Sequence, residues 1–175
     1  SRDRATARRE ASTHVTMVGP NVRPGGIRDE AAYRARINRM LAMADIVKLS
    51  DEDLHWLRGP GEIGELARRL LSSSPETTGP RVVCITEGVK GARGLTLGGE
   101  VFVPATRVEV ADTVGAGDPF NAGVLAALYQ AGALNKPAMT ALDDRILTEA
   151  LSLGVRAAAV TVSRAGANPP WAREL

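Results

Sequence analysis

The sequence predicts an α/β protein in which helices cover a layered sheet. Through the first half of the chain, short apolar runs typical of strands alternate with stretches whose apolar residues recur at helical spacing. The glycine pair Gly98-Gly99 separates two further apolar runs and predicts a tight hairpin, because paired glycines supply the positive φ angles of such turns. The sheet should therefore include some antiparallel pairing. The 175 residues, 44% of them hydrophobic, fit one domain with one sizeable core.

The first strands and helices follow from local patterns. A short apolar run predicts a strand over Val15–Val18, which ends at Gly19-Pro20-Asn21. Apolar residues three and four positions apart predict a helix over Asp29–Ala44. A buried strand is then expected over Asp45–Leu49.

The middle of the chain repeats this alternation. Ser50, followed by acidic residues, predicts the N-cap of a short helix that Gly59-Pro60-Gly61 ends. Glu62–Leu71 has a helical pattern, Ser72–Pro80 is a polar loop, and Arg81–Thr86 is the most strand-like run of the chain.

The second half begins with the hairpin and becomes mostly helical. The hairpin arms are Leu95–Leu97 and Val101–Val103. The remaining expected elements are a strand over Arg107–Val110, helices over Pro119–Ala131 and Leu142–Arg156, and a last strand over Val160–Val162.

Composition excludes several classes of function. Lys and Arg total 22 and Asp and Glu 20, so the net charge of +2 gives no argument for a nucleic-acid partner. The most apolar stretch, Ala122–Leu134, is interrupted by Gln130 and Gly132 and is too short to cross a bilayer. Ser1–Thr13 lacks the apolar core of a signal peptide. We therefore expect a soluble, cytoplasmic protein without a membrane partner.

The cysteine and the histidines do not indicate a metal site. Cys84 stands alone in an apolar run and is expected to be a small buried residue of a strand. His14 and His55 lie far apart, with no second ligand at the spacing of a zinc site.

One glycine-rich segment has the composition of an anion site. Gly115 and Gly117 lack Cβ atoms, so the loop can turn sharply and present successive backbone N–H groups in one direction. Asp118 and Pro119 place the start of a helix directly after the loop, with its unpaired N–H groups and positive dipole end at the same place. The segment is neither a Walker A loop, because Asp118 follows Gly117, nor a dinucleotide fingerprint, because Phe120 occupies the third glycine position.

The carboxylate at the mouth of this loop needs its own explanation. A carboxylate beside phosphates would repel them, so Asp118 is better suited to accept the proton of an attacking hydroxyl during phosphoryl transfer. The alternative is a plain helix cap, since Asp followed by Pro is common at helix starts.

The longer stretch from Asp112 to Phe120 resembles the signature Asp-Thr-x-Gly-Ala-Gly-Asp-x-Phe of the PfkB, or ribokinase-like, carbohydrate kinases, and all seven defined positions match. The resemblance implies a ribokinase-like, Rossmann-like α/β/α sandwich that uses ATP and Mg²⁺. It also implies that Asp118 is the catalytic base and contacts the substrate, and that the backbone of Gly115, Ala116 and Gly117 forms the anion hole.

Other stretches resemble the same family in the same order along the chain. Pro20-Asn21-Val22-Arg23-Pro24 resembles a strand end at which Asn21 and Arg23 would lie near the phosphates, with Arg23 also near the substrate. The residues that resemble the nucleotide-binding loop and the turn beside the adenine are Thr86, Gly88, Gly91 and Gly166.

Some positions depart from the family pattern. Gly19 replaces an aspartate, and Ser50 to Asp53 replaces the motif Asn-x-x-Glu of the magnesium shell. Asp53 is expected to act on the metal through water, with capping as the alternative. The resemblance also implies that Asp112 contributes to a monovalent cation site, for K⁺.

The resemblance covers about Val18 to Trp171. Residues 1–17 are expected to be a poorly matched, disordered N-terminal segment, and 18–175 the C-terminal, ATP-binding part of the kinase domain. The sequence before Gly19 contains neither the sugar-binding residues nor the strands of the β lid, so we expect an N-terminally truncated form. A longer form is expected to be a homodimer.

The sequence therefore predicts ATP-dependent phosphorylation of a sugar hydroxyl, in the manner of a fructokinase. The alternative is a truncated, inactive nucleotide-binding fragment of such a kinase. A third interpretation, an NAD-dependent enzyme, is weakened by Phe120. The residues do not identify the sugar.

Overall fold

The computed structural model describes residues 14–71, 79–112, 115–166 and 168–175. The strands are β1 (Met17–Val18), β2 (Ile46–Ser50), β3 (Val82–Thr86), β4 (Gly91–Leu95) and β5 (Glu100–Pro104). The helices are α2 (Glu30–Ala42), α3 (Asp51–Arg58), α4 (Ile63–Arg68), α5 (Gly117–Gln130), α6 (Lys136–Thr140) and α7 (Asp144–Val162), with 3₁₀ turns η1 (Pro24–Gly26), η2 (Gly88–Lys90) and η3 (Ala172–Glu174).

The five strands form one mixed sheet in the order β1-β2-β3-β4-β5. The first three strands are parallel, with Met17 opposite Ile46 and Val47 opposite Val83. The last three are antiparallel, as expected for the hairpin. The sheet thus combines a parallel half, joined through helices, with an antiparallel half, joined through tight turns.

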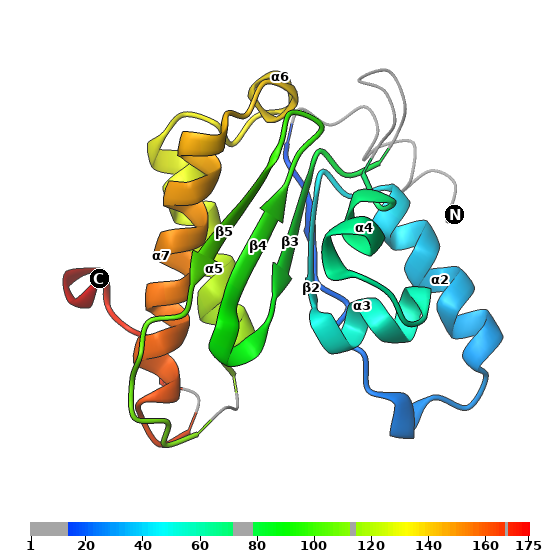
Figure 1. Cartoon of the computed structure of the whole chain (residues 1–175), viewed down its shortest axis with the longest axis horizontal. Helices are drawn as coiled ribbons and strands as arrows, with labels where there is room; N and C mark the ends of the chain where they lie inside the picture. Colours follow the sequence, from blue (N-terminus) through cyan, green and yellow to red (C-terminus); the bar gives the residue numbers. More distant parts are fainter. Residues whose placement is uncertain (1–13, 72–78, 113–114, 167) are drawn as a thin grey trace.

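Helices cover both faces of this sheet, as Figure 1 shows. Helices α2, α3 and α4 lie on one face, and α5 and α7 lie on the other. Side chains alternate between the faces along a strand, so Val47 and Leu49 pack under α2, α3 and α4, while Ile46 packs under α5 and α7. The predicted three-layer α/β/α architecture is confirmed.

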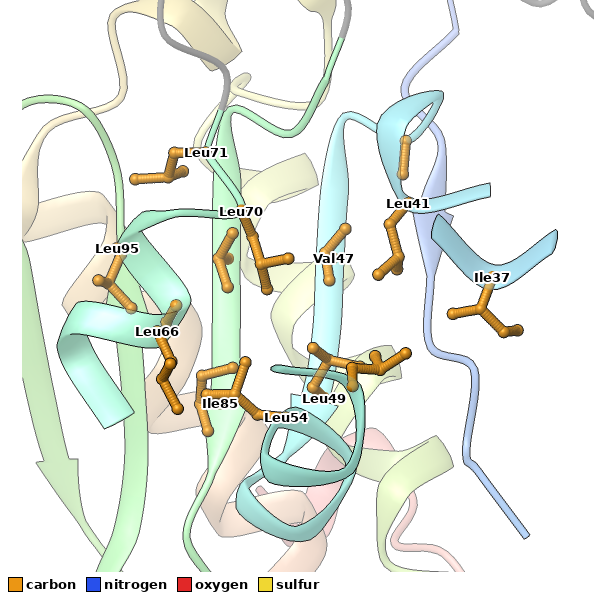
Figure 2. Packing of buried hydrophobic residues seen from close by; sticks show 14 residues of the cluster. Ile37, Leu41, Val47, Leu49, Leu54, Leu66, Leu70, Leu71, Ile85 and Leu95 are labelled. Carbon is orange, nitrogen blue, oxygen red and sulfur yellow. The ribbon is translucent and has the colours of Figure 1, made fainter. Parts of the chain in front are cut away.

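The core beneath α2, α3 and α4 is built from aliphatic side chains (Figure 2). Leu49, Leu54 and Ile85 are fully buried where α3 meets β2 and β3. Burying a leucine or isoleucine side chain stabilises a fold by about 1.5–3 kcal/mol, so this face needs no polar group to hold it.

On the opposite face, α5 and α7 pack at very close range. A Cβ atom on Gly123 would lie 2.8 Å from the Cα of Gly154, so only glycine fits at this crossing. Cys84 is fully buried in this layer, and burial raises the pKa of its thiol to about 12. It is therefore the small buried residue that the sequence predicted.

Two predicted strands are wrong. Val160–Val162 is the last turn of α7, which continues past the predicted end at Arg156; the Thr161 hydroxyl donates to the Ala157 carbonyl within the helix. The short apolar run Val160–Val162 looks the same in a strand and in a buried helix. Arg107–Val110 forms no strand, and the backbone after it is held instead by Asp112 N, which donates to the Val162 carbonyl.

Smaller differences concern element boundaries. The first hairpin strand is Gly91–Leu95, whereas the prediction began at Leu95. The turn bends at Leu97 and Gly98 and is closed by Thr96 N, which donates to the Gly99 carbonyl at 2.9 Å; neither Gly98 nor Gly99 has the predicted positive φ. Helix α6 was not predicted. Thr16, assigned to the disordered N-terminal segment, belongs to the fold: its backbone N–H donates to the Asp45 carboxylate at 2.8 Å. Most of the predicted loop over Ser72–Pro80 lies outside the described residues.

Among the described residues, no helix combines the length and apolar character that a membrane span requires.

Candidate active site

A cavity of about 660 Å³ lies between the ends of β2 and β3 and the helices α5 and α7. Its walls combine polar residues from the strand ends with apolar residues of α7, such as Val155 and Val162. Of the predicted site residues, it brings together Thr86, Gly88, Gly91, Ala116 and Gly117. Elements far apart in the sequence therefore meet at one site.

The start of α5 forms one wall of this cavity. Gly115 has a φ of +81°, which favours glycine, and it turns the chain into the helix. Ala116 is the N-cap residue and makes no side-chain capping hydrogen bond. The first N–H groups of α5 therefore have no side-chain acceptor at the cap, and they are available to an anion. Thr113 and Val114 of the signature lie outside the described residues.

Asp118 lies in the first turn of α5 and is exposed. It directly follows Gly117, which lines the cavity. The side chain is therefore not packed into the core, and its role as the catalytic base stays a prediction.

Lys48 is a site residue that the sequence analysis missed. It lies on β2, lines the cavity, and its Nζ atom would be 3.6 Å from a Cβ atom on Gly117. Burial lowers the pKa of its ammonium group, and the nearby carboxylates of Asp53 and Asp118 partly oppose this shift. The sequence does indicate such a role, because Lys48 lies inside the otherwise apolar run Ile46–Leu49 and a buried charge needs a partner.

The start of α3 forms the neighbouring wall. Ser50 Oγ accepts a hydrogen bond from Asp53 N at 3.0 Å, and the Asp53 carboxylate accepts one from Ser50 N at 3.3 Å. The other oxygen of Asp53 accepts from Val22 N at 2.9 Å. This capping box is the alternative considered for Asp53, while Asp51 and Glu52 are the acidic residues that line the cavity. The metal role of Asp53 stays a prediction.

The loop between β3 and β4 forms the third wall. Gly88 and Gly91 have positive φ values of +54° and +136°. A Cβ atom on Gly91 would lie 2.1 Å from the Val103 carbonyl oxygen, so no side chain fits there. Val89 between them is 90% exposed and lines the cavity. Gly91 is therefore required by the close approach of β5, whereas the space beside Gly88 is open and lets the backbone there approach a ligand.

The remaining predicted residues lie outside the lining of this cavity. Asn21 and Arg23 line a second cavity of about 500 Å³, together with Arg28 and Arg36. Asp112 accepts a hydrogen bond from Gly166 N at 3.2 Å, which places the predicted cation residue beside the predicted adenine turn.

The described residues contain no group of three or more His, Cys, Asp or Glu side chains arranged to hold a metal ion. Magnesium bound with a nucleotide needs fewer protein ligands, because phosphates and water supply most of its oxygen atoms. Asp51 and Glu52 on the cavity wall fit that lesser requirement.

The sequence matches a known family and curated relatives. Residues 5–173 match the family described as "pfkB family carbohydrate kinase". A fructokinase from Rhizobium leguminosarum is 46% identical over 139 residues, which are 79% of this chain and 41% of the relative.

Solved structures match the fold. Aminoimidazole riboside kinase from Salmonella enterica, complexed with aminoimidazole riboside and an ATP analogue, superposes with a TM-score of 0.75 at 29% identity, over 94% of this chain and 51% of that one. A fructokinase from Xylella fastidiosa with bound ATP gives a TM-score of 0.77 at 24% identity, over 94% of this chain and 50% of that one, and matches in fold. The chain thus spans about two fifths to half of these relatives.

Proposed function

The chain belongs to the pfkB family of carbohydrate kinases, and from this premise we propose that it binds ATP and transfers the γ-phosphoryl group to a sugar hydroxyl, in the manner of a fructokinase. The observation that carries the proposal is the uncapped start of α5 at the wall of the cavity, with Asp118 exposed in its first turn. Anion binding and proton acceptance are thereby offered at one place.

The phosphates would bind where backbone donors and a cation meet. In the proposed arrangement the N–H groups from Gly115 to Gly117 donate to phosphoryl oxygens, as at other helix N-termini. Lys48 adds a charge-assisted hydrogen bond from the opposite side, since its ammonium group lies next to Gly117. A bound phosphate would also compensate the burial of this lysine.

The nucleoside would extend along the other walls. The backbone at Thr86, Gly88 and Gly91 is open to it, and the apolar side chains of Val89 and Val155 line the same cavity. Apolar walls with few polar groups suit a purine ring. Gly166 is proposed to lie beside the adenine, and Asn21 and Arg23 beside the phosphates and the substrate.

Asp118 would accept the proton of the sugar hydroxyl as its oxygen attacks the γ-phosphorus. A bond forms between that oxygen and phosphorus, the bond to the bridging oxygen breaks, and ADP leaves with the electron pair. Mg²⁺, when bound, neutralises charge on the β- and γ-phosphoryl oxygens. Asp51 and Glu52 would hold it, with Asp53 acting through water, and Asp112 is proposed to contribute to a K⁺ site.

A second function, nucleotide binding without transfer, is favoured by one observation. Asp118 is exposed, whereas phosphoryl transfer favours a site from which water is excluded. This alternative predicts that ATP stabilises the chain while no sugar-dependent ADP appears.

The Asp118→Asn variant tests the proposal. We expect turnover with fructose to fall by about 10²–10⁴-fold, the usual contribution of a general base, while the affinity for ATP stays nearly constant. ADP release is measured in a coupled assay and ATP affinity by thermal shift. Asp144→Asn is the matched control, because Asp144 occupies the first turn of α7 and lines neither described cavity.

Each outcome separates the two functions. If the unmodified chain is stabilised by ATP without releasing ADP, the binding function replaces the kinase. Normal turnover in Asp118→Asn would remove Asp118 from the mechanism.

A further inference from the structure

Four charged residues form a chain of ion pairs on the face of the sheet opposite the cavity. Arg68 of α4 pairs with Glu100 at 2.9 Å, Glu100 pairs with Arg93, and Arg93 Nε pairs with Glu87 Oε1 at 2.9 Å. We call these four residues the ion-pair chain. It begins on a helix that does not line the cavity and ends in the loop that does.

Alternation along β3 explains how one loop serves both faces. Thr86 lines the cavity, and Glu87, the next residue, points to the α4 side. Glu87 is also fixed through its backbone, because its N–H donates to the Gly91 carbonyl at 2.8 Å and its carbonyl accepts from Lys90 N at 3.1 Å. A displaced Glu87 side chain would therefore displace Thr86 and the turn Gly88–Lys90.

Backbone hydrogen bonds shape this turn, but the side chains at its tip add little to hold it in place. Gly88 and Gly91 are both at positive φ, and Val89 between them is 90% exposed and packs against little. The Glu87 side chain, by contrast, is only 5% exposed. It is the anchored side chain of a turn that is otherwise exposed.

Burying the Glu87–Arg93 ion pair has a free-energy cost, which indicates that the pair does more than fill space. A buried carboxylate needs a partner, and a well-packed apolar pair of similar size is often as stable as a buried ion pair. The buried core of this face is aliphatic. Arg93 meets two carboxylates, with Nε on Glu87 and Nη1 on Glu100, which is a geometry that a planar guanidinium provides and an ammonium group does not.

Helix α4 sits directly on the ion-pair chain. A Cβ atom on Gly64 would lie 3.1 Å from the Glu100 carboxylate, and the ring of Phe102 lies 5.5 Å from the Arg93 guanidinium. Helix and ring leave the side chains of Glu100 and Arg93 little freedom to move.

We infer that Glu87 and Arg93 are positioning residues for the nucleotide, which hold the Thr86–Gly91 loop against the cavity through the ion pair between them. The inference rests on the proposed nucleotide site and assigns no contact between these two residues and the ligand.

The test measures ADP affinity by calorimetry and the melting temperature by thermal shift. Arg93→Met leaves Glu87 buried without its partner and is expected to lower both. The double variant Glu87→Gln/Arg93→Met removes both charges and keeps the side-chain volumes, so it is expected to melt near the unmodified chain. It should nevertheless bind ADP at least about tenfold more weakly. Without the ion pair the Thr86–Gly91 loop can shift, and a small displacement of a binding group lowers affinity strongly.

Two further variants sharpen the result. Arg93→Lys keeps the charge and loses the fork, so its affinity should fall between those of the unmodified chain and the double variant. Arg145→Met is the matched control, since it breaks the exposed Arg145–Glu149 pair of α7 and should leave ADP affinity unchanged.

The outcomes distinguish this inference from the function on which it rests. A double variant that binds ADP as tightly as the unmodified chain overturns the positioning role alone. An unmodified chain that binds no ADP overturns both. If affinity falls only in proportion to the melting temperature across all variants, the ion-pair chain is structural and the inference is wrong.

Discussion

Helices α3 and α5 point their N-termini at the same cavity, and these two N-termini are capped differently. Helix α3 is closed by its own side chains, because Ser50 and Asp53 bind each other's backbone N–H groups. Helix α5 begins at Gly117 after Ala116, whose side chain caps nothing. Both ends carry a positive dipole, so what separates them is whether an acceptor is already present. An anion is expected at α5, and α3 has no need of one.

The acidic residues reinforce the contrast. Helix α3 has Asp51, Glu52 and Asp53 in its first turn, whereas the first turn of α5 has only Asp118. Both helix ends affect the pKa of Lys48, since carboxylates of α3 and α5 each raise it against the effect of burial. The cavity therefore has an acidic wall suited to a cation and an open wall suited to phosphate.

The largest expected effect comes from giving α5 a capping acceptor at the N-cap position, where α3 has Ser50. Ala116→Asp should weaken ADP binding by about 100-fold or more, because a carboxylate placed where a phosphate binds costs several kcal/mol. Stability should stay equal or rise by up to about 1 kcal/mol, since an acid at a helix N-terminus is favourable. Calorimetry and chemical denaturation measure the two effects.

Ala116→Val separates bulk from an added acceptor in this experiment. It should lose less affinity than Ala116→Asp, because it adds a side chain of comparable volume without the charge and without an oxygen that could accept from the α5 N–H groups. Equal losses in the two variants would mean that the site is blocked by bulk and that the open helix end is not an anion site.

Lys48→Met tests the residue between the two helix ends. We expect ADP affinity to fall about 10- to 100-fold, the range for a lost hydrogen bond to a charged group, while stability at neutral pH is equal or higher because a buried charge is removed. Lys136→Met is the control, since Lys136 pairs with Asp45 away from the cavity lining. Unchanged ADP affinity in Lys48→Met would exclude a phosphate contact.

The same variant predicts a pH dependence. Burial lowers the pKa of Lys48 in the folded protein below 10.5, so the unfolded chain binds more protons just below that pH. The free energy of unfolding of the unmodified chain should therefore increase as the pH rises toward 10.5. The stability advantage of Lys48→Met should shrink over the same range, which denaturation at several pH values would measure.

Local sequence rules predicted the parts of the fold that depend on local interactions. A tight turn after β4, the Ser50 cap and the alternation of strand and helix all formed, although the turn uses no positive φ at Gly98 or Gly99. The last strand failed at Val160–Val162, because α5 packs along α7 and keeps this β-branched run helical through contacts that the local sequence does not contain.

The candidate site divides in the same way. Ala116 and Gly117 were predicted from one continuous motif, and they line the cavity. Lys48 was missed because its role depends on β2 facing α5, which only the folded sheet establishes. The Glu87–Arg93 pair likewise depends on the register that places Arg93 opposite Ile85.

The smallest expected effect comes from opening the closed helix end. Ser50→Ala removes the hydroxyl that accepts from Asp53 N and should cost about 1 kcal/mol, or a melting temperature about 2–4 °C lower. ADP affinity should change less than about twofold, because this hydroxyl is already occupied by the backbone of α3. Ser50→Thr keeps the cap and should restore the melting temperature. A large loss of ADP affinity in Ser50→Ala, with Ser50→Thr unaffected, would mean that α3 also receives the ligand, and the contrast between the two helix ends would then be wrong.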